Sequence, residues 1–451
     1  MAEGGTAGDL ENRHSAAGVM GIQIPRAATA AALAVLSAIA VHSLWLAVQH
    51  GLFAAWGGGD FHAYWYYGHF VRQGVSPYHA VLTGTDIALP VTYLDGVTAQ
   101  QVPAQLSMMP ANTAPMMLLL SLFSWLSWPV AKAAWLGCNV LFALTVPWLA
   151  IRILPDDSRL SAASRAAICL IFYGLYSTRV TLEMGQTTIV VLLLMLASIR
   201  LADRRWLLSG LCLGIALSKY SLAFPAFVLL VGARRGKVVL TSLAVQAAGM
   251  LGVSLLGSGR LSETAEFYRG VLRVHAGQQG MHVLAQLPVG IVSNLAVGIC
   301  TIAIVVLLGI WAWRQGWMRN AVDLRTPAAL HLFNLVGLLT LLAIYHRGYD
   351  AAFVVVTFAL ALWEGAPLGG RSRATGFAGL LFWAAAVLTL TLPTAVLRVI
   401  FAVFGAAGRD PVAAAESLIS LTVLALFGVS FYQMAVLRRP PLSASRRSAD
   451  G

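Results

Sequence analysis

Long apolar runs alternate with short polar segments along most of the chain. A helix needs about 20 mainly apolar residues to cross a bilayer, and the first run of that length covers residues 27–49. Further runs predict crossings near 130–151, 163–181, 186–201, 237–257, 286–313, 328–345, 349–366, 374–397 and 412–437. Together with the pair of short helices described next, they predict an all-α polytopic membrane protein with about 12 transmembrane helices.

Two apolar runs need a separate argument. Residues 108–128 form a short run interrupted by prolines, and residues 206–232 carry a basic cluster at each end. Basic residues concentrate in cytoplasmic loops, and the clusters at 200–205 and 234–237 are both cytoplasmic only if 108–128 does not cross. We therefore predict a re-entrant or interfacial helix at 108–128. At 206–232 we predict a hairpin of two short helices with its tip near Lys219.

The same charge rule divides the chain into segments. Arg13 and Arg26 precede the first helix, which places the N-terminus in the cytoplasm. We expect a cytoplasmic tail at 1–26, a transmembrane domain at 27–437 and a cytoplasmic tail at 438–451. The external loop at 51–129 is expected to hold interfacial helices.

Composition agrees with a membrane protein. The chain is 59% hydrophobic and 11% charged, which is too apolar for one water-soluble core. Its net charge of +12 comes from small basic groups between apolar runs, so we do not expect a nucleic-acid partner. All four cysteines lie in apolar segments without metal-ligand spacing, and we expect neither a metal nor another cofactor.

The stretch Gly57–His79 places one carboxylate among aromatic and imidazole side chains. Three glycines allow a bend before Asp60, and a helix from there puts Asp60, Tyr64 and Tyr67 on one face. Alternatively, this is an interfacial helix whose aromatic residues lie at lipid headgroups. Both interpretations hold if Trp65 and Tyr66 face lipid while the first face serves a site.

The predicted topology brings further polar residues to the same external side. Ionisable side chains at helix ends are costly unless paired or solvated. Snorkelling of Lys219 to the headgroups and an Arg347–Asp350 pair are the structural alternatives to a functional site. The candidates are His62, Tyr78, Glu183, Gln186, Lys219, His346, Arg347 and Asp350.

A carboxylate beside cations suits a reaction in which a base takes a hydroxyl proton and a phosphate leaves. The sequence contains neither a nucleotide phosphate loop nor a dinucleotide-binding glycine turn. Nucleotides are cytoplasmic, so we expect a lipid-linked phosphate donor at this external site.

Four blocks of the sequence resemble glycosyltransferase family 87 of the GT-C superfamily, whose members use polyprenyl-phosphate sugars. The blocks are Gly59-Asp60-Phe61 continuing to Gly74-Val75-Ser76-Pro77-Tyr78, residues 110–135, Gly185-Gln186 with residues 210–225, and His346 to Asp350. Two features depart from the family pattern. Met109-Pro110-Ala111-Asn112 replaces a Pro-Pro pair, and Asp60 stands without a second aspartate, so a metal is not required.

The resemblance implies a GT-C fold and inverting transfer of a hexose, often mannose, to a hydroxyl of a lipid or glycan acceptor. The reaction would take place on the extracytoplasmic side of the bacterial inner membrane and build a cell-envelope glycan. Asp60 would be the base, with Gln186, Lys219 and His346 near the donor phosphate and sugar. We add Arg347 and Asp350 on the donor side, and expect acceptor or sugar-stacking contacts from Tyr64, Tyr67, Tyr78, His62 and Glu183.

Two other classes of protein fit the helical pattern. A transporter or lipid flippase would use many crossings and broken helices, but the sequence shows no two-fold repeat and its polar residues gather at one face. A membrane assembly or anchoring protein would leave Asp60 and its aromatic helix without a role.

Overall fold

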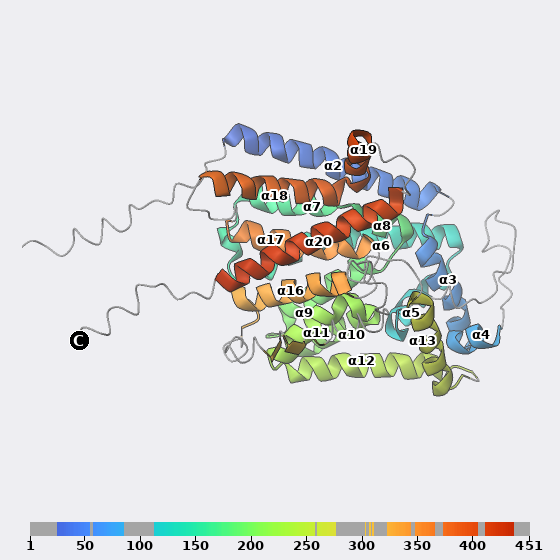
Figure 1. Cartoon of the computed structure of the whole chain (residues 1–451). Helices are drawn as coiled ribbons and strands as arrows, with labels where there is room; N and C mark the ends of the chain where they lie inside the picture. The colour runs from blue at the N-terminus through green and yellow to red at the C-terminus, as the bar shows by residue number, and fades with distance from the viewer. Residues whose placement is uncertain are drawn as a thin grey trace, which may run out of the picture.

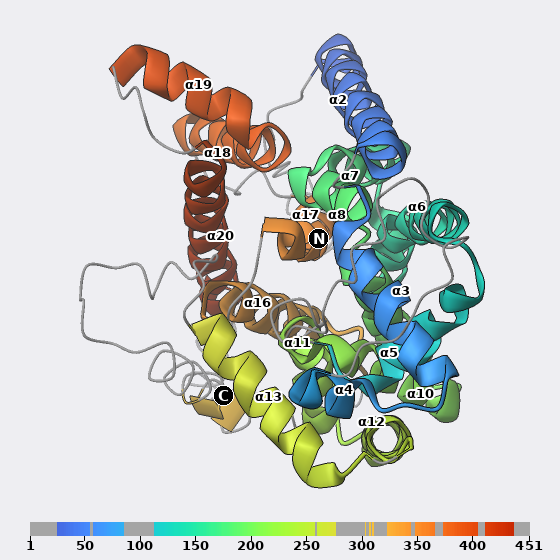
Figure 2. The same cartoon turned by 90° about the vertical axis from the view of Figure 1, so that its right-hand side faces the viewer.

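The computed structural model describes residues 25–54, 57–84, 112–257, 259–276, parts of 303–310, 323–343, 348–365, 373–404 and 411–436. Every element in these ranges is a helix, which confirms the all-helical prediction. Long helices run lengthwise through the molecule, including α2 (Arg26–Phe53), α6 (Trp128–Arg152), α12 (Gly236–Ser254) and α20 (Pro411–Val436) (Figure 1). The short helices α3 (Gly59–Arg72), α4 (Pro77–Thr83), α5 (Ala114–Ser121) and α13 (Leu261–Ala276) gather at one end of the bundle (Figures 1 and 2).

Five helical stretches in the described residues are long and apolar enough to cross a membrane. A sixth is added if α8 (Tyr176–Met184) and α9 (Thr188–Leu201), which meet at a bend of 115°, form one broken span. Other apolar helices have only 10–17 residues, so the predicted count of about 12 is not confirmed. These shorter stretches include α7 (Ala162–Gly174), α16 (Pro327–Ala343), α17 (Val355–Trp363) and part of α18 (Arg373–Thr391), while α19 (Pro393–Phe404) precedes α20. The predicted crossing at 286–313 lies mostly outside the described residues.

The segment predicted to stop short of crossing the membrane is indeed short. Helix α5 and the following 3-10 turn η3 (Leu122–Trp125) together cover Ala114–Trp125. At about 1.5 Å per residue they fall well short of the roughly 30 Å of a bilayer core. They pack against α3 at the end of the bundle, as expected for a helix that does not cross.

The predicted hairpin at 206–232 is confirmed by its neighbours, although this stretch taken whole is long enough to cross. It consists of α10 (Trp206–Ala216), the turn η5 (Leu217–Lys219) and α11 (Tyr220–Gly232). A Cβ added at Gly210 would lie 2.5 Å from Thr241 of α12, and one at Gly214 would lie 2.6 Å from Val245. Helices α10 and α12 therefore run parallel, and α11, which connects them in the chain, must run in the opposite direction. Asp203 and Arg235 form a salt bridge at the base of the hairpin, which leaves Lys219 at its tip.

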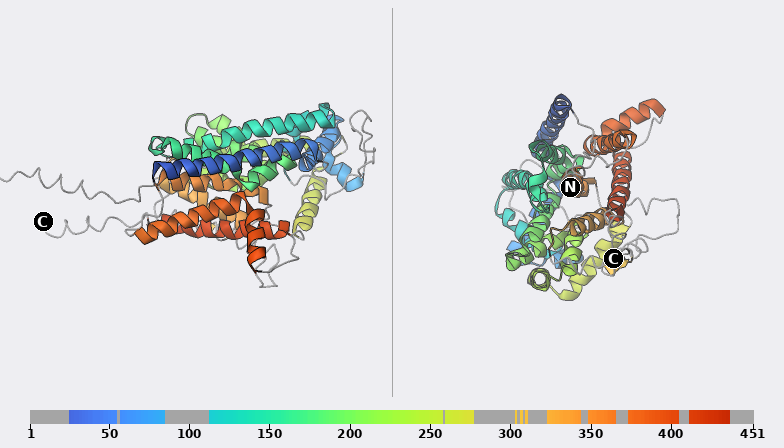
Figure 3. Two further views of the ribbon diagram at one scale, coloured as in Figure 1. Left: turned by 90° about the horizontal axis from the view of Figure 1, so that it is seen from above. Right: turned by 90° about the vertical axis from the view of Figure 1, so that its left-hand side faces the viewer.

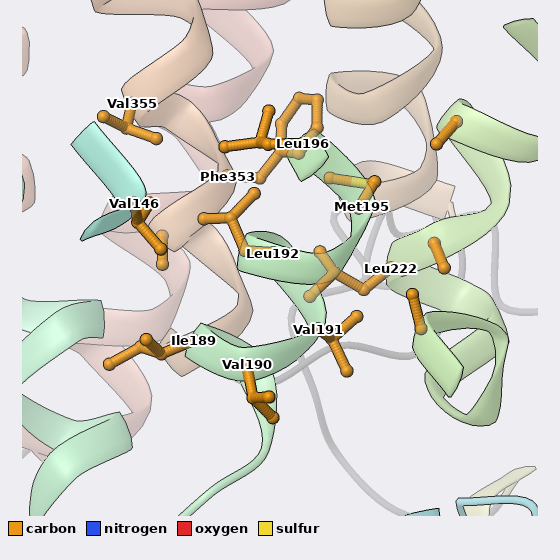
Figure 4. Close-up of a cluster of buried hydrophobic side chains, with 14 of the residues drawn as sticks. Val146, Ile189, Val190, Val191, Leu192, Met195, Leu196, Leu222, Phe353 and Val355 are labelled. Atoms are coloured by element: carbon orange, nitrogen blue, oxygen red, sulfur yellow. The ribbon is translucent and has the colours of Figure 1, made fainter. Parts of the chain in front are cut away.

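Helix α9 lies inside the bundle and is apolar on all sides. Its Val191, Leu192, Met195 and Leu196 are each fully buried. Figure 4 shows them among side chains from α6, α11 and the η6–α17 segment, where η6 covers Gly348–Val354. A helix that is hydrophobic all round is expected at the centre of a bundle. This packing fixes the start of α9, where the candidate site residues lie.

The aromatic residues of α3 are buried by protein, so the prediction that Trp65 and Tyr66 face lipid is wrong. Trp65 is 0% exposed and Tyr66 is 7% exposed. The indole Nε1 of Trp65 donates a hydrogen bond of 3.0 Å to the carbonyl oxygen of Leu126. The α5–η3 segment and α6 cover this face of α3, a tertiary contact that the local pattern could not reveal. Seen from another side, α3 and α4 remain at the same end of the long helices (Figure 3).

Candidate active site

Asp60 lies in the first turn of α3, and three contacts fix the start of that helix. Gly58 has a φ of 73°, which favours glycine. Its N–H donates to the carbonyl oxygen of Glu183 at 2.8 Å, and its own carbonyl accepts from the N–H of His62 at 2.8 Å. A Cβ at Gly58 would lie 3.0 Å from the side chain of Lys132, so the turn has no spare room. These contacts hold Asp60 at a half-buried position.

Gln186 lies at the corner between α8 and α9 and reaches Asp60 directly. The corner is closed by Gly185, whose φ is 68° and whose added Cβ would lie 2.7 Å from Phe61. The Gln186 amide nitrogen Nε2 donates to Asp60 Oδ2 at 2.6 Å and to the Tyr349 hydroxyl at 3.2 Å. The predicted convergence of Asp60 and Gln186 is therefore present.

Lys219 pairs with Asp350 inside the protein. Its ammonium forms a 2.5 Å salt bridge with Asp350 Oδ1 and donates to Thr188 Oγ1 at 2.7 Å. Thr188 in turn donates to Asp350 Oδ1 at 2.7 Å. The Lys219 side chain is only 11% exposed, and its Nζ lies 4.7 Å from the centroid of the Tyr349 ring. Snorkelling to lipid headgroups is therefore wrong for Lys219.

Tyr64 on α3 is connected to the same corner through Asn112. The Asn112 amide donates to the Tyr64 hydroxyl and, at 2.8 Å, to Thr187 Oγ1. Burial raises the pKa of Tyr64, and the nearby carboxylates of Asp60 and Asp350 raise it further. Tyr64 therefore stays protonated beside both carboxylates.

The consecutive residues Gln186, Thr187 and Thr188 each hold a different part of the chain. We call the resulting group the corner cluster. It joins α3, the hairpin tip, η6 and the segment before α5, which lie far apart in the sequence. Its members are Asp60, Tyr64, Asn112, Gln186, Thr187, Thr188, Lys219, Tyr349 and Asp350.

Two of the other predicted residues make contacts outside this cluster. The Glu183 carboxylate lies 3.0 Å from His50 and 3.4 Å from Arg179, forming an ionic group that anchors the end of α8. His62 packs edge-on to Trp128 with centroids 4.7 Å apart. Burial lowers the pKa of His62, so this imidazole favours the neutral form.

The predicted sugar-stacking tyrosines are buried in protein. Tyr64, Tyr67 and Tyr78 are 3%, 1% and 0% exposed. Tyr67 packs against Tyr66 and Phe70, whereas Tyr78 packs against Phe267 and Tyr268 of α13. Their rings therefore present no open face to a sugar in this structure. His346 and Arg347 lie outside the described residues.

Several members of the corner cluster escaped the sequence analysis. Asn112, Thr187, Thr188 and Tyr349 are neutral, and the search for candidates favoured charge. The available signals were the run of polar residues Gln186-Thr187-Thr188 at the start of an apolar helix and the position of Tyr349 next to Asp350. A buried apolar helix that begins with several hydrogen-bonding side chains needs partners for them.

The corner cluster combines a carboxylate, a group chemically able to act as a base, with an ammonium, a group able to bind an anion. Asp60 is a carboxylate with one amide donor already placed on it. The Lys219 ammonium has three N–H groups, and within the described residues two of them are used by Asp350 and Thr188. The third makes no hydrogen bond within the described residues, and an anionic oxygen is the kind of partner that an ammonium binds. No group of three or more His, Cys, Asp or Glu side chains that could hold a metal occurs in the described ranges.

Comparison with known proteins identifies the family of this chain. No curated protein and no solved structure matches it significantly. The model of glycosyltransferase family 87 matches residues 112–344, just over half of the 451 residues. The matched range contains Gln186, Thr188 and Lys219, while Asp60 and Asp350 lie on either side of it. The chain therefore belongs to glycosyltransferase family 87 and is a membrane glycosyltransferase.

Proposed function

We propose that this protein transfers a hexose from a polyprenyl-phosphate donor to a hydroxyl of a lipid or glycan acceptor. The family resemblance favours mannose as the sugar, a GT-C fold and inversion at the anomeric carbon. The observation that carries the proposal is the hydrogen bond from Gln186 to Asp60, because it joins the candidate base to the cluster that contains Lys219.

In the proposed reaction, Asp60 takes the proton of the acceptor hydroxyl as the acceptor oxygen attacks the anomeric carbon. The bond from that carbon to the phosphate oxygen breaks, and polyprenyl phosphate leaves with the bonding electron pair. Attack on the face opposite to the phosphate gives inversion. Asp60 ends the step protonated and returns its proton to water.

Lys219 is the proposed contact of the donor phosphate. Charge grows on the phosphate as the sugar departs, and a placed ammonium in a water-poor site stabilises that charge. The third N–H of Lys219 points to this role, while Asp350 and Thr188 hold the ammonium in place. His346 and Arg347 would add to this contact if the proposal is right.

The distribution of arginines supports an extracytoplasmic site. Arg152, Arg204 and Arg325 lie close enough to Arg200 for their charges to act on it. Arg235 lies at the base of the hairpin, at the end opposite to Lys219. Basic residues mark the cytoplasmic side of membrane proteins. We therefore propose that the corner cluster faces the outside of the bacterial inner membrane.

The direct test replaces Asp60 by Asn and by Ala in protein reconstituted with a synthetic polyprenyl-phosphate mannose. Loss of a general base lowers the rate by about 10²- to 10⁴-fold, and donor binding should persist. Asp156→Asn is the matched control, because Asp156 is half exposed at a turn near Arg159. Near wild-type turnover of both Asp60 variants would exclude Asp60 as the base.

The donor itself can be identified independently of catalysis. Mass spectrometry of lipids that copurify with the wild-type protein should detect a polyprenyl-phosphate sugar. The Lys219→Ala variant should retain less of it than wild type. A different lipid class bound equally by both proteins would contradict the proposed donor and the role of Lys219.

A transporter or flippase remains a weaker reading of the architecture. The 115° bend between α8 and α9 resembles the broken helices of transporters. Membership of a glycosyltransferase family favours group transfer, so we do not propose transport.

A further inference from the structure

We infer that Tyr349 is a positioning residue for Asp60, acting through the amide of Gln186. The inference rests on the proposed role of Asp60 as the base. It assigns a function to a neutral side chain that makes contact with the cluster at two places, through its hydroxyl and through its ring.

The carboxylate of Asp60 fixes which way the Gln186 amide points, and the hydroxyl of Tyr349 holds the amide nitrogen in that place. An amide nitrogen carries two hydrogens, whereas the amide oxygen only accepts. Nε2 donates to both Asp60 Oδ2 and the Tyr349 oxygen. If the amide were reversed, its oxygen would face the carboxylate and repel it. Two oxygen atoms therefore hold Nε2 beside the carboxylate, and Tyr349 supplies one of them. The amide oxygen accepts from the N–H of Thr187 at 3.3 Å.

Contacts on both sides hold Tyr349 in place. Lys219 Nζ lies 4.7 Å from the centre of its ring, an arrangement that favours a cation over an aromatic face. The next residue, Asp350, is 3% exposed and is bound to Lys219 and Thr188. Further along the same segment, Phe353 and Val355 pack into the core around α9 (Figure 4). The hydroxyl is thus presented from a rigid element.

A donor on a carboxylate stabilises its charged form and lowers its pKa. Loss of the Tyr349 hydroxyl removes one of the contacts that hold the amide nitrogen, so the hydrogen bond from Gln186 to Asp60 weakens. The pKa of the catalytic base should then rise, and its carboxylate should be held less firmly toward the cluster. The charged and titratable groups around Asp60 come from several elements. His62 and Tyr64 lie on α3 with Asp60, Lys132 of α6 lies against Gly58, and Glu183 lies behind Gly58 with its partners His50 and Arg179. Lys219 on η5 and Tyr349 and Asp350 on η6 complete the described set.

The test compares Tyr349→Phe, Gln186→Ala and the double variant in the transfer assay over a range of pH. Tyr349→Phe keeps the ring beside Lys219 and removes only the hydroxyl. We expect kcat to fall about tenfold and the acidic limb of the pH profile to move up by about one unit, as for loss of one hydrogen bond to a charged group. The KM for the donor should stay within about twofold, because the contact with Lys219 remains. Tyr173→Phe is the matched control, since its hydroxyl bonds only to the carbonyl oxygen of Leu144 among the described residues.

The double variant decides whether Tyr349 acts through Gln186. If it does, Tyr349→Phe has no further effect once Gln186 is alanine. The inference would be overturned if the losses of kcat in the two single variants multiplied in the double variant. It would also be overturned by a Tyr349→Phe variant with the wild-type pH profile. Gln186→Ala alone should reproduce the upward shift of the acidic limb, so the inference stays testable if one variant folds poorly. Activity of Asp60→Asn would instead remove the proposed function, whatever Tyr349→Phe does.

Discussion

Lys219 and Asp350 form a buried salt bridge between the tip of the α10–α11 hairpin and the start of η6, 131 residues apart in the chain. Thr188 contacts both partners. The pair, with Thr188, therefore links η5, η6 and the start of α9. The positive charge of Lys219 is also the charge that we propose contacts the donor phosphate.

Breaking this salt bridge should destabilise the protein. Asp350→Leu leaves the Lys219 charge without its carboxylate, and removal of one partner of a buried pair costs about 3–5 kcal/mol. The double variant Lys219→Met with Asp350→Leu removes both charges and should recover much of that stability, but it should not recover transfer. Thermal unfolding in detergent followed by tryptophan fluorescence measures the first effect. A single variant as stable as wild type would show that the pair is not a stabilising contact.

The turn before Asp60 should not tolerate a side chain. Gly58→Ala places a Cβ at a positive φ and 3.0 Å from Lys132, whereas Gly74→Ala meets the same backbone strain with nothing within 4 Å. Both variants should lose about 1 kcal/mol from the strained backbone, and only Gly58→Ala should also lose transfer activity. Unfolding temperatures and turnover of the two proteins separate these effects. Equal activities would mean that crowding at Gly58 does not displace Asp60.

Two buried asparagines should respond in opposite ways to leucine. Asn112 bonds to Tyr64 and Thr187, whereas the side-chain nitrogen and oxygen of Asn139 have no hydrogen-bond partner within the described ranges. Asn112→Leu leaves partners unsatisfied and should cost about 1–3 kcal/mol. Asn139→Leu removes a buried polar group and should be neutral or stabilising. Thermal unfolding of both variants tests the contrast, which fails if Asn139→Leu proves the more damaging.

Mild acid should weaken the fold through His69 on α3. Burial, with a smaller effect from Arg72, lowers the pKa of His69 from 6.5 to about 4. Between these values the unfolded chain binds a proton that the folded protein excludes, so stability rises with pH. Stability should therefore fall as pH decreases from about 6.5 toward 4, and His69→Phe should reduce that fall. Unfolding temperatures between pH 4 and pH 8 measure it; an identical pH dependence in the variant would assign the effect to other groups.

Labelling can test which end of the bundle is outside. The four native cysteines, Cys138, Cys169, Cys212 and Cys300, are first replaced by serine. Thr83 at the end that holds α4 and Arg205 at the hairpin base are both exposed. A membrane-impermeant maleimide should label Thr83→Cys in intact cells and Arg205→Cys only after permeabilisation. The reverse pattern would place the corner cluster in the cytoplasm.

The sequence was informative where charge and apolar length act together. Basic clusters at both ends of 206–232 predicted a hairpin, and the prediction of its tip at Lys219 followed from the same rule. The convergence of Asp60 and Gln186 also followed from topology. The surroundings of Trp65 depend instead on α5 and η3 folding over α3, which is a tertiary contact. The partner of Lys219 was not predictable either, because spacing along the chain says little about which distant carboxylate will meet it.

The corner at Gln186, Thr187 and Thr188 has a consequence for insertions and deletions. Successive residues of an α-helix point about 100° apart, so a change of one residue between Gly185 and Thr188 would rotate the register of everything that follows. Residues 189–197 of α9 are all apolar, so a rotated helix would still place apolar side chains in the core. The corner itself is sensitive to rotation, because Asp60, Asn112 and Lys219 each meet a different one of its residues. A frame-preserving change of length at this corner should therefore leave a folded membrane protein in which the side chains of the corner cluster no longer meet.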